Sequence, residues 1–180
     1  MTSGPASRVT ADSEPTVLDH ASMQVWGERV GMLARRHRLL VALDGPLGAG
    51  KTTLVQAACR GAGYQGIVTS PTYALIHRYD LPEAAALYHA DLFRIEDASD
   101  LLELGWEDLL DGRSAVFVEW AERAGDALPP DRWEIRLAAG PTRHARTVTF
   151  TSLGAAPPVP APSVAASNSA LAADAARSAG

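Results

Sequence analysis

The chain has 180 residues, which is enough for one α/β domain with a hydrophobic core and for little more. Its formal net charge of −5 argues against charge-driven, non-specific binding of nucleic acid, although a local patch can still contact an RNA–protein complex. The single cysteine, Cys59, excludes an internal disulfide, argues against a cysteine-based metal site and fits a reducing compartment.

No segment of the sequence has the pattern of a membrane anchor or a signal peptide. The apolar runs are too short to span a bilayer, and the N-terminus lacks the apolar segment of a secretory signal. We therefore expect a cytoplasmic protein that makes no contact with a membrane.

Composition divides the chain into three parts. Residues 1–15 are rich in Ser, Thr, Pro, Ala and Gly without periodicity, which predicts a flexible leader. Residues 16–151 carry the hydrophobic patterns of a folded domain. Residues 152–180 consist mainly of Ala, Pro and Ser, so they bury too little apolar surface to offset their ordering entropy and predict a disordered tail.

The domain opens with a short predicted strand at residues 16–18, followed by an amphipathic helix. Asp19 or Ser22 is the candidate N-cap, because both side chains can accept a hydrogen bond from the first turn. The helix is expected to continue to about Arg36, with Trp26 on its apolar face.

The stretch from Leu39 to Thr53, LLVALDGPLGAGKTT, organises the rest of the domain. The unbroken apolar run at residues 39–43 predicts a parallel strand covered on both faces. The segment after it fits the phosphate-binding pattern GxxxxGK[ST] at every specified position, and a helix expected at residues 53–60 completes the order of strand, loop and helix. This order predicts a nucleotide-binding P-loop.

Each residue type in the motif has a chemical reason. Glycines let the loop turn tightly and bring backbone N–H groups against phosphate oxygens. The Lys51 ammonium is expected to contact the β- and γ-phosphates, and the Thr52 hydroxyl to ligate Mg²⁺. The residues expected to hold the nucleotide in this segment are Gly45, Pro46, Leu47, Gly48, Ala49, Gly50, Lys51, Thr52 and Thr53.

A hydroxyl-rich loop follows the P-loop helix. Pro71 lacks an N–H and cannot pair in a central strand, so Ser70, Thr72 and Tyr73 are expected in a loop beside it. These hydroxyls are candidates for reaching a γ-phosphate or a bound water, although such residues often make only local turn hydrogen bonds.

Two later apolar strands each end in an acid. Residues 84–90 lead into Asp91, and residues 114–118 lead into Glu119. Ligands of open parallel sheets bind at the C-terminal ends of the strands, where a carboxylate can hold Mg²⁺ directly or through water. Each acid also fits a solvated loop residue or a helix cap, and the sequence leaves open which of the two touches the metal. His89 is the one histidine near this site, and a packing or hydrogen-bonding role is its simpler interpretation.

The last part of the domain predicts two short helices, at residues 99–105 and 106–110, and then two alternating strands. The strands, at residues 132–138 and 142–151, are joined by an Ala-Gly-Pro turn, which predicts an antiparallel hairpin. The whole pattern predicts an α/β P-loop NTPase fold of three layers, with a mainly parallel sheet and a C-terminal antiparallel hairpin.

Taken together, these motifs resemble the bacterial TsaE (YjeE) family, P-loop ATPases that take part in threonylcarbamoyladenosine modification of tRNA. The resemblance covers residues 17–150, and one departure is Phe93, where the family usually has tyrosine. The matching segments, in family order and spacing, are GPLGAGKTT at 45–53, SPTY at 70–73, HADLFR at 89–94, LELG at 102–105 and VEW at 118–120.

The resemblance implies a weak ATPase that uses ATP and Mg²⁺ and acts with TsaD and TsaB, so that tRNA is contacted only indirectly through the complex. It also implies a role for each residue of the site. These are Lys51 on the phosphates, Thr52 and Glu119 on Mg²⁺, Asp91 in or beside the metal shell, Ser70, Thr72 and Tyr73 in a switch-like loop, and Trp120 and Arg143 near the nucleotide.

Two other functions use the same loop. A small-molecule or nucleotide kinase would need a lid with paired arginines over the γ-phosphate, whereas the arginines after the P-loop helix are scattered singly. A nucleotide-dependent adaptor would bind ATP without needing to hydrolyse it, and the sequence barely separates it from a weak ATPase.

Overall fold

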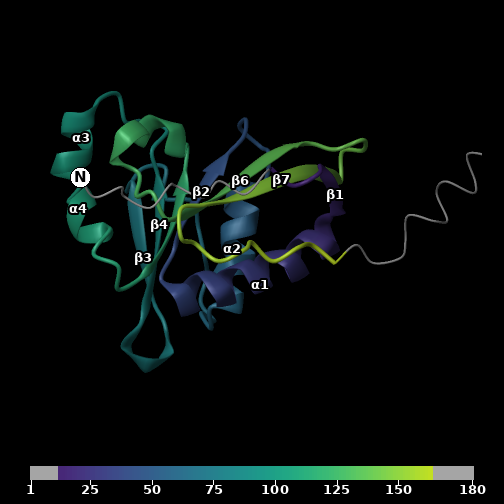
Figure 1. The fold of residues 1–180 in the computed structure, drawn as a ribbon, viewed down its shortest axis with the longest axis horizontal. Helices are drawn as coiled ribbons and strands as arrows, with labels where there is room; N and C mark the ends of the chain where they lie inside the picture. Colours follow the sequence, from purple (N-terminus) through teal and green to yellow (C-terminus); the bar gives the residue numbers. More distant parts are fainter. Residues whose placement is uncertain (1–11, 164–180) are drawn as a thin grey trace, which may run out of the picture.

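The computed structural model describes residues 12–163, which form one seven-stranded sheet with the order β1-β7-β6-β2-β5-β4-β3 (Figure 1). The four strands β6, β2, β5 and β4 run parallel to one another, whereas β3, β7 and β1 pair antiparallel with their neighbours. The strands are β1 (Thr16–Asp19), β2 (Leu40–Asp44), β3 (Ile76–Asp80), β4 (Ala86–Asp91), β5 (Ala115–Glu119), β6 (Arg132–Ala139) and β7 (Ala145–Leu153).

Helices cover both faces of this sheet, so the predicted fold class is confirmed, including the antiparallel hairpin of β6 and β7. None of the helices between residues 12 and 163 is long and apolar enough to cross a membrane. The helices are α1 (His20–His37), α2 (Lys51–Gly61), α3 (Ala98–Glu103) and α4 (Trp106–Leu109), with short 3₁₀ segments η1 (Pro82–Ala84) and η2 (Ala121–Ala127).

α1 and α2 pack against each other on one face of the sheet (Figure 1). Of the two predicted N-caps of α1, Asp19 is the one used: its side chain accepts a hydrogen bond from Ser22 N at 2.8 Å, and this bond lowers the pKa of Asp19. At Gly31 a Cβ atom would lie 1.9 Å from the carbonyl oxygen of Ala58, so only glycine allows the helices to approach this closely. This contact fixes the position of α2, which begins at the end of the P-loop.

Cys59 lies on α2 in the same layer and is fully buried. Burial disfavours the charged thiolate and raises the pKa of Cys59 to about 12. The thiol therefore stays protonated at neutral pH, and Cys59 packs as a small core residue rather than acting as a nucleophile.

The opposite face is covered only in part. α3, α4 and η2 enclose a second apolar cluster over β2, β5 and β4, which includes Trp106, Leu40, Val116 and Val118. The covered strands therefore have helices on both faces, which explains why β2 and β5 are continuous apolar runs in the sequence.

Residues 12–15 and 152–163 correct the expected domain boundaries. Ser13 exchanges hydrogen bonds with the backbone of Phe150, so the expected flexible leader is wrong from Asp12 onward. Residues 152 and 153 belong to β7, and residues 154–163 continue along the α1 side of the sheet. The remainder of the expected leader and tail, residues 1–11 and 164–180, lies outside the described residues.

Two tryptophans explain why the start of the Ala/Pro segment packs. The Trp26 indole N–H donates to the carbonyl of Pro160 at 2.6 Å, and the Trp133 indole N–H donates to the carbonyl of Pro157 at 2.6 Å. Val159 between them is 8% exposed. Composition predicted disorder because Ala and Pro bury little area, but the packing partners here are backbone carbonyls, which composition does not reveal.

Deleting residues 154–180 should lower the melting temperature relative to a chain that ends at Ser163. The shorter chain loses the burial of Val159 and two indole hydrogen bonds, together about 3 kcal/mol. For a domain of this size that loss corresponds to about 6–12 °C, measurable by thermal unfolding. The chain ending at Ser163 keeps every one of these contacts and is the matched control. Equal melting temperatures for the two truncations would show that residues 154–163 do not stabilise the domain.

Candidate nucleotide-binding site

The P-loop joins the end of β2 to the start of α2, as the sequence predicts. Gly45 has φ +139°, and a Cβ atom there would lie 2.3 Å from the carbonyl oxygen of Leu137 on β6. Only glycine fits this conformation and this approach. α2 begins at Lys51, two residues before its expected start. The first N–H groups of a helix have no partner within it, and these groups are available to an anion at the loop.

Lys51 is buried at the loop, and its Nζ donates to the carbonyls of Gly45 at 2.6 Å and Pro46 at 3.2 Å. The ammonium also lies 4.1 Å from the centre of the Trp120 ring, within the range of a cation–π contact. Trp120 has φ +58°, a left-handed conformation that costs about 1–3 kcal/mol in a bulky residue. Trp120 adopts this conformation directly after β5, and its indole ring lies against the ammonium of Lys51. Lysine and tryptophan thus form one contact at the edge of the loop.

Glu119 comes from the strand next to β2 and meets the first turn of α2. The Thr52 hydroxyl donates to Glu119 Oε1 at 2.7 Å, and Nε2 of His89 lies 2.9 Å from the same oxygen. In the strand order β2-β5-β4, β5 is the direct neighbour of β2, so Glu119 ends the strand beside the P-loop strand. Sequence reasoning left His89 with a packing or hydrogen-bonding role, and its carboxylate partner was not foreseen.

Asp91 lies one strand farther out, directly across from Glu119 in the pairing of β4 with β5. Its Oδ2 accepts hydrogen bonds from the Thr72 hydroxyl at 3.0 Å and, more weakly, from the Ser70 hydroxyl at 3.5 Å. Its Oδ1 accepts from the backbone N–H of Phe93 at 3.0 Å. The structure therefore connects Asp91 to the hydroxyl-rich loop, whereas Glu119 is connected to the P-loop.

These groups surround one cavity of about 460 Å³. Most of the predicted site residues line it, and so do two residues that were not assigned to the site, Phe93 and Arg146. The lining residues are Leu47, Gly48, Ala49, Gly50, Lys51, Thr52, Thr53, Ser70, Thr72, Asp91, Phe93, Glu119, Trp120 and Arg146.

Four predicted residues do not line this cavity: Gly45, Pro46, Tyr73 and Arg143. The carbonyls of Gly45 and Pro46 accept hydrogen bonds from Lys51. Tyr73 is 88% exposed, and the guanidinium carbon of Arg94 lies 5.5 Å from the centre of the Tyr73 ring. Arg143 lines a smaller neighbouring cavity of about 170 Å³, which shares Gly50 and Thr53 with the first. The structure thus places Tyr73 on the rim of the loop and Arg143 beside the P-loop helix.

Arg146 is a site residue that sequence reasoning missed. Its Nε donates to the carbonyl of Ala49 at 3.0 Å and its Nη2 to that of Gly48 at 3.3 Å, so it braces the P-loop from β7. It lines both cavities. The alternating pattern of β7 gives no signal for this role. The hydrogen bonds form only because β7 pairs with β6, which places Arg146 opposite Ala139 and near the P-loop.

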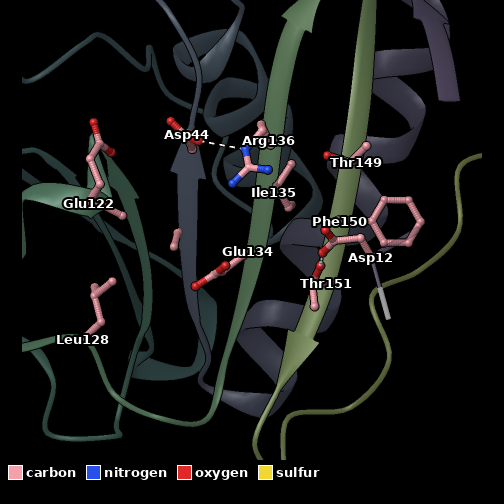
Figure 2. Close-up of a pocket in the computed structure, with 12 residues that line it drawn as sticks. Asp12, Asp44, Glu122, Leu128, Glu134, Ile135, Arg136, Thr149, Phe150 and Thr151 are labelled. Carbon is pink, nitrogen blue, oxygen red and sulfur yellow. Dashed lines mark hydrogen bonds and ion pairs between the residues drawn. The ribbon is translucent and has the colours of Figure 1, made fainter. Parts of the chain in front are cut away.

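A further cavity, of about 140 Å³, lies on the open part of the other face of the sheet (Figure 2). Figure 2 shows Arg136 on β6 directed toward Asp44 at the end of β2, at an Nε–Oδ2 distance of 2.9 Å. This hydrogen bond raises the pKa of Arg136. Because no residue from Gly45 to Thr53 lines this cavity, we do not assign it to the nucleotide site.

The donor set at the P-loop fits Mg²⁺. No group of three His, Cys, Asp or Glu side chains that could by itself enclose a metal occurs within residues 12–163. Mg²⁺ does not require such a group, because it is usually held by one or two carboxylates, water and substrate phosphates. The Thr52 hydroxyl and the carboxylates of Glu119 and Asp91 are hard oxygen donors that line one cavity.

Comparison with known proteins gives the family of the chain. The family model for the threonylcarbamoyl adenosine biosynthesis protein TsaE matches residues 17–148. The "tRNA threonylcarbamoyladenosine biosynthesis protein TsaE" of Streptomyces coelicolor is 38% identical over 136 residues, which cover 73% of this chain and 91% of the relative. The Haemophilus influenzae protein of the same name is 37% identical over 115 residues, covering 62% and 72%.

A solved structure shares the fold. The crystal structure of Bacillus subtilis YdiB superposes with a TM-score of 0.64 at 24% identity, covering 84% of this chain and 90% of that one. The family match extends from β1 into β7 and includes the P-loop, the hydroxyl-rich loop and both strands that end in acids. The chain therefore belongs to the TsaE family.

Proposed function

We propose that this chain binds ATP with Mg²⁺ and hydrolyses it slowly, and that this nucleotide cycle supports threonylcarbamoyl modification of the adenosine beside the tRNA anticodon. It acts in the cytoplasm with TsaD- and TsaB-type partners, and it contacts tRNA only through that complex. The observation that carries the nucleotide part is the meeting of Lys51, Thr52 and Glu119 around one cavity at the P-loop. The names of the relatives support the tRNA part.

The P-loop residues bind and neutralise the phosphates. The Lys51 ammonium, now bonded to two loop carbonyls, provides the positive charge for the β- and γ-phosphates, together with the N–H groups at the start of α2. Thr52 and Glu119 hold Mg²⁺, which when bound offsets the negative charge that develops on the phosphate oxygens. Arg146 donates hydrogen bonds to the loop carbonyls of Gly48 and Ala49, which holds this part of the P-loop in place.

Asp91 links the site to the switch-like loop. It accepts hydrogen bonds from Ser70 and Thr72, so the loop hydroxyls and the carboxylate hold one another in place. We propose that this set orients the attacking water and senses the γ-phosphate. The loop is exposed at Tyr73, so a partner protein that contacts it there can act on Asp91, and thus on the rate of hydrolysis, through Ser70 and Thr72.

The arginines argue against a kinase. A kinase lid would bring guanidinium groups over the γ-phosphate. Among the described residues, Arg146 is the one arginine that lines the nucleotide cavity, and its Nε, Nη1 and Nη2 all donate to backbone carbonyls. Arg78 is engaged with Asp80, and Arg94 lies against Tyr73. A lid of paired arginines is therefore not formed within residues 12–163.

A comparison of ATP with a non-hydrolysable analogue separates the weak ATPase from a nucleotide-dependent adaptor. The full-length chain is combined with its TsaD- and TsaB-type partners, and a preformed threonylcarbamoyl donor and tRNA are both supplied in excess over the proteins. We expect both nucleotides to support assembly of the complex, but only ATP to support more than one modified tRNA per complex. The measurement is the amount of threonylcarbamoyladenosine against time. Repeated turnover with the analogue would favour the adaptor, and no effect of either nucleotide would contradict the proposed role.

A further inference from the structure

We propose that His89 is a positioning residue for Glu119: its Nε2–H holds Oε1 of the carboxylate, so that Oε2 is left for the metal. This inference rests on the proposed function of Glu119 as a Mg²⁺ ligand. The proposed function assigns the phosphates and Mg²⁺ to the P-loop residues and the two acids. His89 adds a buried hydrogen-bond partner for one of these acids, Glu119.

The location of His89 excludes a direct role at the nucleotide. The residue is 0% exposed and does not line the nucleotide cavity. It lies two residues before Asp91 on β4 and pairs with Phe117 on β5, which places it on the same side of the sheet as Glu119 and α2. From there it reaches Glu119 diagonally across the two strands, with 2.9 Å between Nε2 and Oε1.

The hydrogen bond fixes which ring nitrogen carries the proton. A carboxylate oxygen only accepts, so the proton of this bond is on Nε2. Nδ1 has no hydrogen-bond partner among residues 12–163. The buried ring is thus set up to donate in one direction, toward Glu119.

Two hydrogen-bond donors on Oε1 of Glu119 fix the orientation of the carboxylate and therefore the direction of Oε2. Oε1 receives the Thr52 hydroxyl at 2.7 Å and the His89 ring at 2.9 Å, whereas no hydrogen bond within the described residues reaches Oε2. A glutamate side chain has several rotatable bonds, and fixing them only at the moment of metal binding would cost entropy. The His89 bond comes from the core and does not depend on the loop, so the carboxylate stays oriented even when Thr52 turns toward a metal. Such outer partners orient metal ligands in many sites.

The experiment compares His89→Gln, His89→Asn and His89→Leu in the full-length chain. The amide nitrogen of Gln reaches the place of Nε2, whereas that of Asn reaches only the place of Nδ1, so the pair differs in reach and not in chemistry. The readout is the ratio of ATP affinity with Mg²⁺ to ATP affinity in EDTA. We expect this ratio to fall about 10- to 100-fold in the Asn and Leu variants and to be largely retained in the Gln variant. Both affinities are measured on the same variant, so a general loss of stability affects both and does not change their ratio.

Glu119→Gln separates this inference from the proposed function. If Glu119→Gln leaves the affinity ratio unchanged, the metal assignment of the proposed function fails, and the inference fails with it. If the affinity ratio falls in Glu119→Gln but is unchanged in His89→Leu and His89→Asn, only the positioning role fails. If the Gln, Asn and Leu variants of His89 all lose it equally, reach toward Oε1 is not what matters, and His89 acts only by packing.

Discussion

Replacing Lys51 with alanine is expected to abolish ATP hydrolysis and to weaken ATP binding. Lys51 is the only lysine in the chain, and it supplies the one charged side chain of the P-loop itself. A hydrogen bond to a charged group contributes about 1.5–3 kcal/mol, which corresponds to about 10- to 150-fold in affinity. Hydrolysis should fall by at least about a hundredfold, because charge develops on the phosphate oxygens in the transition state. Phosphate release and nucleotide titration measure the two effects.

The matched control for this substitution is Arg78→Ala. Arg78 is also cationic, but it lies on the surface in an ion pair with Asp80, far from the P-loop in sequence and absent from the cavity. It should leave both ATP affinity and hydrolysis unchanged. The side chain of Lys51 is buried against Trp120, so unfolding of the Lys51→Ala protein is checked by its circular dichroism. A folded Lys51→Ala protein that hydrolyses ATP normally, alone or with partners, would rule out the site.

The parts of the fold that local chemistry determines were predictable from the sequence. The P-loop is fixed by glycines at positions such as Gly45, where a side chain would meet the backbone of β6, and the strand before it is a continuous apolar run. The acids at 91 and 119 were expected at one edge of the sheet because parallel strands end together. Their pairing across β4 and β5 follows from that topology.

What was missed depends on contacts between distant segments. Arg146 bonds the P-loop from β7, and His89 bonds Glu119 from β4, and neither residue stands in a local pattern that names its partner. The Ala/Pro segment was expected to be disordered, yet its carbonyls satisfy the indoles of Trp26 and Trp133. Composition reports the area that a segment can bury, whereas these contacts use backbone oxygens that every sequence has.

Glu119 is expected to contribute more to Mg²⁺ binding than Asp91. The structure connects Glu119 to Thr52, the other expected Mg²⁺ ligand, at 2.7 Å, whereas Asp91 is bonded to Ser70, Thr72 and the N–H of Phe93. Glu119→Gln should therefore abolish hydrolysis and remove most of the Mg²⁺ dependence of ATP binding, since an amide oxygen is a poorer ligand for a hard cation.

Asp91→Asn is the matched substitution, because it also exchanges one carboxylate oxygen for an amide nitrogen without changing the size of the side chain. The amide oxygen can replace only one of the two acceptors that now serve the loop hydroxyls and Phe93 N, so the switch-like loop loses part of its anchoring. Turnover should fall about 10- to 100-fold while more of the Mg²⁺-dependent affinity is retained. Titrating ATP with Mg²⁺ and with EDTA against both variants measures the ranking. If Asp91→Asn loses the metal dependence and Glu119→Gln keeps it, the two carboxylates have the opposite roles, and the hydrogen bond between Thr52 and Glu119 does not mark the metal site.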